Sequence, residues 1–120
     1  MSDVLTDLLT RLRADNDLDL AVVGTDGLVV AADHVEGADA EAIATSTGDL
    51  YLMMTAFGAE VGAGDPTILT TEYDGGTVMV AALEHGATLT MVSGHAVNLG
   101  RLRTAARRFQ EQYRGALVPA

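Results

Sequence analysis

Three aspartates, Asp15, Asp17 and Asp19, alternate in the way that opens a calcium-binding loop, in which oxygen ligands stand at every second position. The rest of the loop pattern is missing. Leu20 stands where the sharp turn requires glycine, and Asp26 stands where a bidentate glutamate is required. We therefore expect no calcium site in this segment.

The histidines His34, His85 and His95 are the imidazoles available for metal binding or general-base catalysis. None has a His or a carboxylate at the i+4 spacing of a helical metal site. Ser93 lies two residues before His95, but it sits in no Gly-x-Ser-x-Gly elbow and no third group is indicated that would orient the imidazole. The chain has no cysteine, which excludes thiolate catalysis and Cys-ligated zinc. We expect surface histidines and no metal.

The glycine-rich segment 58–64 has the composition of a phosphate-binding loop but the wrong context. It contains no lysine and follows a predicted helix, whereas phosphate loops follow a strand and lead into a helix N-terminus. The C-terminal end of a helix carries partial negative charge, which repels phosphate. The segment therefore reads as a helix stop and a loop. We expect no cofactor and a chain that is not an enzyme.

Charge is distributed unevenly along the 120 residues, whose net charge is −10. Residues 14–100 hold fourteen acidic residues and no basic one, whereas residues 101–114 hold five arginines against Glu111. The negative charge of residues 14–100 repels the phosphate backbone of nucleic acids, so we expect no nucleic-acid partner. The arginines of the last segment either solvate a helix and pair with nearby carboxylates or form a docking patch for a partner. The candidates for such a patch are Arg101, Arg107 and Arg108.

The composition, with 48% apolar residues, is that of a folded chain rather than a disordered one. No apolar run approaches the roughly 20 residues that a membrane-spanning helix needs, and the N-terminus lacks the basic and apolar regions of a secretory signal. We therefore expect one domain over residues 1–120, a cytoplasmic location and no membrane insertion.

Hydrophobic periodicity predicts an α+β fold. Residues 4–12 read as an amphipathic helix, and apolar runs on both sides of Asp26-Gly27 predict a hairpin, because Asp-Gly favours a type I′ turn. Three more strands with glycine-bearing turns follow as a meander, at 67–73, 77–83 and 87–93. With helices at 39–57 and 98–114, the order is α-β-β-α-β-β-β-α. These connections permit a five-stranded antiparallel sheet in the order 2-1-5-4-3.

Both faces of this sheet should be covered by helices, because strand segments at 20–23, 28–32 and 78–83 are apolar without interruption. The last helix has one clear inward side, since its apolar residues share one arc and its five arginines lie on the other.

The middle helix, by contrast, has two sides that could pack. Its main apolar side predicts contact with the sheet and consists of Ala40, Ile43, Thr47, Leu50, Tyr51, Met54 and Phe57. The opposite side carries one charge and mixes small residues with two large apolar ones: Ala42, Thr45, Ser46, Asp49, Leu52, Met53 and Ala56. A monomer would expose that side, so we infer a homodimer joined through it. The alternative is that a terminal segment folds over this side.

The strand at 67–73 is predicted at an edge of the sheet, where backbone amides are left unpaired. It has no lysine and no internal proline to protect it. We expect this strand to pair with its symmetry mate across a two-fold axis. We expect this strand seam of the dimer to include Ile68, Thr70 and Glu72.

The element order, the hairpin sequence Val22-Val23-Gly24-Thr25-Asp26-Gly27-Leu28, and Asn98-Leu99-Gly100-Arg101-Leu102 at the start of the last helix resemble the Roadblock/dynein light chain family. The similarity spans roughly residues 3–114. It implies a profilin-like fold and a small noncatalytic dimer that joins its middle helices and third strands. Members of the family bind and regulate Ras-like small GTPases or serve as adaptors in motors and signalling scaffolds, so the resemblance implies a Ras-like partner.

Two other functions fit the same element order. A small-molecule sensor would enclose its ligand between sheet and helices and predicts an internal cavity. A structural adaptor attached to a histidine kinase or motor complex would use the same surfaces as a GTPase regulator.

Overall fold

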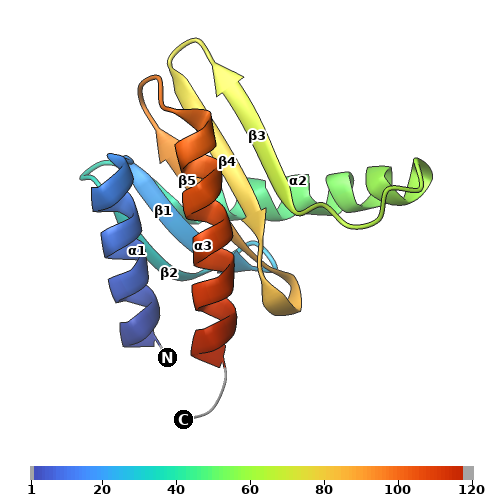
Figure 1. Cartoon of the computed structure of the whole chain (residues 1–120), viewed down its shortest axis with the longest axis horizontal. Coiled ribbons are helices and arrows are strands. Elements are labelled where there is room, and N and C mark those ends of the chain that lie inside the picture. Colours follow the sequence, from blue (N-terminus) through green and yellow to red (C-terminus); the bar gives the residue numbers. More distant parts are fainter. Residues whose placement is uncertain (1, 118–120) are drawn as a thin grey trace.

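The computed structural model describes residues 2–117. In chain order the elements are α1 (Ser2–Asn16), β1 (Leu20–Thr25), β2 (Leu28–His34), α2 (Ala40–Glu60), β3 (Ile68–Tyr73), β4 (Gly76–Ala82), the short 3-10 turn η1 (Glu84–Gly86), β5 (Ala87–Ser93) and α3 (Leu99–Leu117). The strands form an antiparallel sheet in the order β2-β1-β5-β4-β3 (Figure 1). The predicted α+β order and sheet topology are confirmed.

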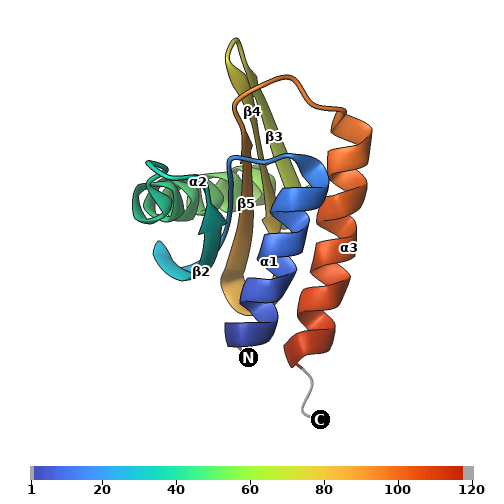
Figure 2. The same ribbon diagram turned by 90° about the vertical axis from the view of Figure 1, so that its left-hand side faces the viewer.

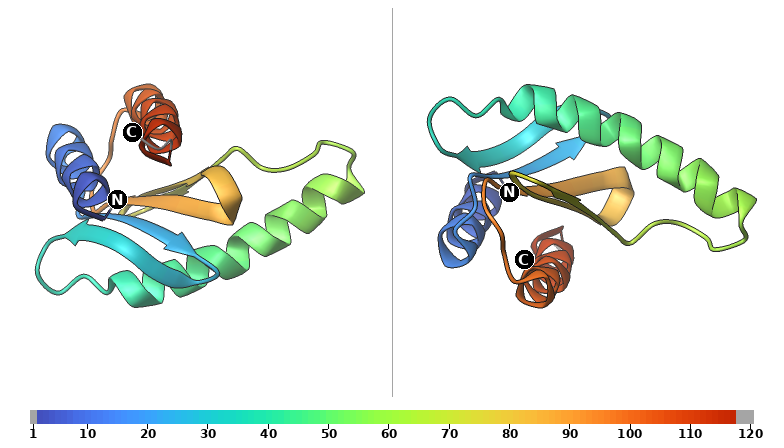
Figure 3. Two further views of the ribbon diagram at one scale, coloured as in Figure 1. Left: turned by 90° about the horizontal axis from the view of Figure 1, so that it is seen from below. Right: turned by 90° about the horizontal axis from the view of Figure 1, so that it is seen from above.

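The molecule has three layers (Figure 2). Helices α1 and α3 lie side by side on one face of the sheet, and α2 lies alone on the other. Seen from below and from above, α2 crosses the sheet obliquely, and its C-terminal end extends beyond the edge strand β3 (Figure 3).

The turn between β1 and β2 explains why this hairpin could be predicted. Asp26 and Gly27 both have positive φ, 54° and 77°, as a type I′ turn requires. The register shifts by one residue further along, because Val23 pairs with Ala31 whereas Gly24 pairs with Val29. Val30 is therefore the extra residue of a β-bulge.

The two faces of the sheet bury unequal cores. On the α1 and α3 face, seventeen buried residues form one apolar cluster, which includes Leu5, Leu9, Leu89, Met91 and Phe109. They come from both helices, from all strands except β3, and from two connecting segments. On the α2 face, the buried cluster consists of Leu20, Val22 and Ala44, with partly buried neighbours. A buried hydrogen bond of 2.8 Å between the hydroxyls of Thr47 and Thr90 also joins α2 to the sheet.

The prediction that β2 is covered on both faces is wrong for its first half. Leu28 is 72% exposed, and Val29 and Val30 are also exposed. The covered part is the second half, where Ala31 joins the large cluster and Ala32 packs beside the α2 cluster. The bulge at Val30 interrupts the register of this edge strand, and Leu28 lines an open hollow beside α2 instead of packing under a helix.

Side chains cap the two later helices. The Asp39 carboxylate accepts from the backbone N–H of Ala42 at 3.0 Å, and the Asn98 side-chain oxygen accepts from the N–H of Arg101 at 3.0 Å. The inward side of α3 is as predicted, with Leu102, Ala106, Phe109 and Tyr113 buried and all five arginines exposed.

Candidate protein-interaction surfaces

The outward side of α2 is an exposed apolar surface. All seven residues predicted for the helix seam are exposed, with Leu52 at 70% and Met53 at 65%. The predicted inward side is only partly realised, because Ala44 and Thr47 are the buried residues of α2 and Phe57 is 52% exposed. The assignment of Phe57 to the sheet contact is therefore wrong.

Phe57 is exposed because the sheet ends before the helix does. The last turns of α2 extend past β3, where no strand of the same chain can cover them (Figures 1 and 3). Phe57 and Val61 line a shallow apolar hollow there, together with Met54, Gly58, Pro66 and Leu69. Much of the apolar surface at this end of the helix is thus left exposed, with Phe57 at 52% and Val61 at 62%.

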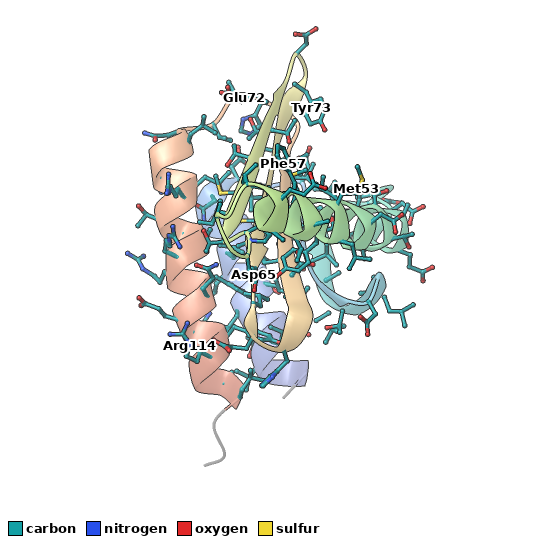
Figure 4. All side chains as sticks on the ribbon, turned by 90° about the vertical axis from the view of Figure 1, so that its right-hand side faces the viewer. Met53, Phe57, Asp65, Glu72, Tyr73 and Arg114 are labelled. Carbon is teal, nitrogen blue, oxygen red and sulfur yellow. The ribbon has the colours of Figure 1, made fainter. Side chains whose placement is uncertain are left out.

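The edge of β3 lies beside this projecting end (Figure 4). One side of β3 pairs with β4, and its other side is the end of the sheet. Thr70 and Glu72 are exposed, whereas Ile68 is partly buried against the core on the α1 and α3 face. Ile68 can therefore take part in a strand seam through its backbone. We call the outward side of α2 and the free edge of β3 together the α2–β3 surface.

A close approach of two backbones fixes α2 on the sheet. A Cβ atom added at Gly48 would lie 3.0 Å from the N and Cα atoms of Gly27 in the β1–β2 turn. The Thr45 hydroxyl donates to the Gly27 carbonyl oxygen at 3.2 Å. Sequence analysis did not single out Gly48, although glycine inside a predicted helix signals a close contact.

A hollow of about 550 Å³ lies between α2 and the β1–β2 turn, large enough for a small molecule. It is open to solvent, since Leu28 and Leu52 in its wall are both about 70% exposed. Its lining includes Thr45, Asp49 and Leu52, which are residues of the predicted seam. This open hollow is therefore not the enclosed cavity that a small-molecule sensor would need.

The serine and histidine of segment 93–95 do not face each other as a nucleophile and a base. The Ser93 hydroxyl donates to the His95 carbonyl oxygen at 3.1 Å and accepts from the His95 backbone N–H. The imidazole instead contacts the Ala96 carbonyl oxygen through Nδ1 at 2.9 Å and the Asp17 carboxylate through Nε2 at 3.1 Å. These acceptors raise the pKa of His95, the Ala96 carbonyl contributing most. The spacing of 78 residues between Asp17 and His95 gave no signal in the sequence.

Metal ligands do not converge in the part of the chain that the structure describes. No group of three His, Asp or Glu side chains there could hold a metal ion.

The arginines predicted for docking separate into two sets. Arg101 and Arg108 line a groove between α1 and α3 and are joined there by Arg11 of α1. Arg107 is exposed outside the lining of this groove. Arg11 could not be found from the sequence, because its neighbours depend on which helix packs beside α1.

The chain belongs to the Roadblock/LC7 domain family, whose model matches residues 4–93. The match ends with β5, so α3 and its arginines lie outside it. No helix among residues 2–117 combines the length and the apolar character needed to cross a membrane.

Solved structures share the whole fold, including α3. A Roadblock/LC7 domain from Streptomyces avermitilis superimposes with a TM-score of 0.85 at 22% identity, covering 93% of this chain and 96% of that one. MglB from Myxococcus xanthus gives a TM-score of 0.83 at 12% identity, covering 98% of this chain and 93% of that one. The gliding protein MglB from Thermus thermophilus gives a TM-score of 0.82 at 16% identity, covering 92% of this chain and 85% of that one. No protein with curated annotation matches the sequence.

Proposed function

We propose that this chain is a noncatalytic homodimeric module of the cytoplasm that regulates or scaffolds a Ras-like small GTPase, with residues 1–120 forming a single Roadblock-like domain. Membership of the Roadblock/LC7 family supports a regulatory or binding role. The α2–β3 surface is the observation that carries the dimer.

The outward side of α2 has the composition of a helix–helix interface. Ala42, Thr45 and Ser46 are small, which lets a second helix approach closely, and Asp49 is the one charge among the seven seam residues. Leu52 and Met53 supply apolar area, and fully burying a side chain of that kind contributes about 1.5–3 kcal/mol. In the proposed dimer, the projecting end of each α2 covers the sheet of its partner.

The free edge of β3 supports the same arrangement. Pairing of two β3 strands across a two-fold axis satisfies backbone groups that are otherwise open at this edge. The outward side of α2 and the free edge of β3 lie on one side of the chain (Figure 4). A single two-fold axis can therefore relate both the two helices and the two strands of the proposed dimer.

In the proposed mechanism, the dimer acts by holding the switch segments of the GTPase and supplies no catalytic group itself. The candidate arginine fingers Arg101, Arg107 and Arg108 stand on a regular helix on the face of the sheet opposite α2. A regular helix that faces solvent offers little reach toward a bound nucleotide, so these arginines supply no finger in the proposed mechanism.

A charge-insertion variant tests the proposal. Leu52→Glu with Met53→Glu places like charges across the seam, and we expect sedimentation velocity to show one chain where the unchanged protein shows two. Circular dichroism should show the same fold, because both side chains are exposed in the single chain. In affinity capture from the source cell, the unchanged protein should retain a GTP-binding protein and the variant should not.

Val4→Glu with Ala14→Glu is the matched control, since it adds the same charge at two exposed positions of α1. It should remain a dimer. A Leu52→Glu/Met53→Glu variant that stays dimeric would show that α2 is not the seam, and capture of no nucleotide-binding protein would contradict the GTPase assignment.

A further inference from the structure

A groove of about 610 Å³ is lined by residues of α1 and α3. These two helices lie on the face of the sheet opposite α2 (Figure 2). Its base is apolar, because Leu12 is part of the buried core and Leu8 and Ala105 pack against that core. Its rim carries the exposed guanidinium groups of Arg11, Arg101 and Arg108. Asp15 is the single carboxylate among the lining residues.

The arginines of the chain are all confined to two elements. The segments of α1 and α3 contain all seven arginines of the chain and four acidic residues, a net charge of +3. The rest of the chain contains thirteen acidic residues and no arginine or lysine, a net charge of −13. The groove is therefore a local positive site on a molecule that is negative as a whole.

The arginines of the groove differ from two others of the chain in their ion pairs. Two other arginines have carboxylate partners, Arg13 with Asp33 and Arg114 with Glu84. Among the described residues, Arg11, Arg101 and Arg108 form no salt bridge. Arg101 donates to the Asp15 backbone oxygen at 3.3 Å, a contact with a carbonyl that leaves its charge unpaired in the described part of the chain.

We propose that this groove binds a short acidic segment of a partner protein, with carboxylates on the arginine rim and aliphatic side chains on the apolar base. The planar guanidinium group matches a carboxylate with two parallel hydrogen bonds. The apolar base adds area that a purely ionic contact lacks. This inference goes beyond the proposed GTPase role and does not rest on it.

The surrounding charge favours a short segment over an extended polyanion. Nucleic acid or an anionic membrane would also meet the carboxylates of the other elements, which carry −13. Salt screens interactions between exposed charges beyond about one Debye length, roughly 8–10 Å, so a segment confined to the groove interacts mainly with the charges that line it. The acidic partner is therefore attracted locally although the chain as a whole repels it.

The position of the groove gives this contact a consequence. The sheet lies between the helices that line the groove and α2, which carries the larger part of the α2–β3 surface (Figures 2 and 3). A second protein could thus occupy the groove while the α2–β3 surface is engaged, and the chain would link two partners.

Fluorescence anisotropy with two labelled peptides tests this proposal. In the probe peptide, Glu and Leu residues are placed four positions apart. In the control peptide, every Glu is replaced by Gln. We expect saturable binding of the Glu peptide that weakens with added salt, and no binding of the Gln peptide. Arg101→Gln with Arg108→Gln should weaken binding about tenfold, from two lost partly exposed ion pairs.

Arg103→Gln with Arg107→Gln is the matched control, because it removes the same charge from the same helix outside the groove lining. It should change the affinity less than about twofold. Equal weakening by both variants, or no saturable binding of the Glu peptide, would overturn the proposal. Tighter binding to phosphatidylserine vesicles than to the peptide would assign the groove to a membrane. If the unchanged protein forms larger oligomers at higher concentration and the Arg101→Gln/Arg108→Gln variant does not, the groove would be assigned to a second copy of the chain.

Discussion

The two faces of the sheet are completed in different ways. The α1 and α3 face buries a large apolar core under two helices whose outward sides are polar. The α2 face buries a small cluster under one helix, and this helix exposes Leu52, Met53 and Phe57. The first face is finished within the chain, whereas the second has more apolar surface than its own sheet can cover. The comparison separates residues that fold this chain from residues available for association.

The largest expected effect compares the two phenylalanines of the chain. Phe109 of α3 is 1% exposed and Phe57 of α2 is 52% exposed. Phe109→Ala should lower the free energy of unfolding by about 3–5 kcal/mol, because it leaves a cavity in the large core. Phe57→Ala should lower it by less than about 1 kcal/mol. Urea unfolding of both variants measures the difference.

Both substitutions are best made in the Leu52→Glu/Met53→Glu background, so that dimer formation does not add to the stability of the chain. If the two variants lose similar stability there, α2 carries more of the fold than its exposed side chains indicate.

A smaller effect compares two glycines inside helices. Gly48→Ala should destabilise the chain by about 1–3 kcal/mol, since the new Cβ would press on the Gly27 backbone at 3.0 Å. Gly115 of α3 has no neighbour within 4 Å of an added Cβ, so Gly115→Ala should stabilise α3 by up to about 1 kcal/mol. Thermal unfolding followed by circular dichroism reports both shifts. A stabilising Gly48→Ala would show that α2 is not held tightly against the hairpin.

The smallest effect concerns His95, which joins the segments after α1 and before α3. Its pKa is raised by the Ala96 carbonyl and by Asp17, so any stability gained from protonation is present below the ordinary histidine pKa and is lost as the pH rises through the raised value. Asp17→Asn should lower the pKa of His95 but leave it above the ordinary value, because the larger cause remains. NMR titration of the imidazole measures this.

Asp15→Asn is the control for this titration, since it removes the same charge without touching the ring. If it lowers the pKa of His95 as much as Asp17→Asn does, the direct hydrogen bond is not the cause.

The topology could be predicted because the local signals agreed with it. Asp26-Gly27 fixed the first hairpin, and the arginine side of α3 fixed which side of that helix faces inward. The first half of β2 was mispredicted, because an apolar run does not show that a strand will bulge at Val30 and lie at an edge of the sheet, where Leu28 borders an open hollow. Phe57 was misassigned for a related reason, since periodicity gives the side of a helix and not the point where the sheet beneath it ends.

The candidate surfaces were predictable where one element carries them. The outward side of α2 could be read from helical spacing alone, and its seven residues are exposed as a set. The groove could not, because Arg11 and Arg101 are brought together by the packing of helices that are far apart in the sequence. The Asp17–His95 contact was hidden by the same kind of separation.

The placement of all arginines on α1 and α3 also gives the molecule a large electric dipole moment. A negatively charged protein that approaches it will turn it until the two helices lead, before any contact forms. Encounters would then be oriented even between two acidic proteins, and their association rate would fall as salt concentration rises.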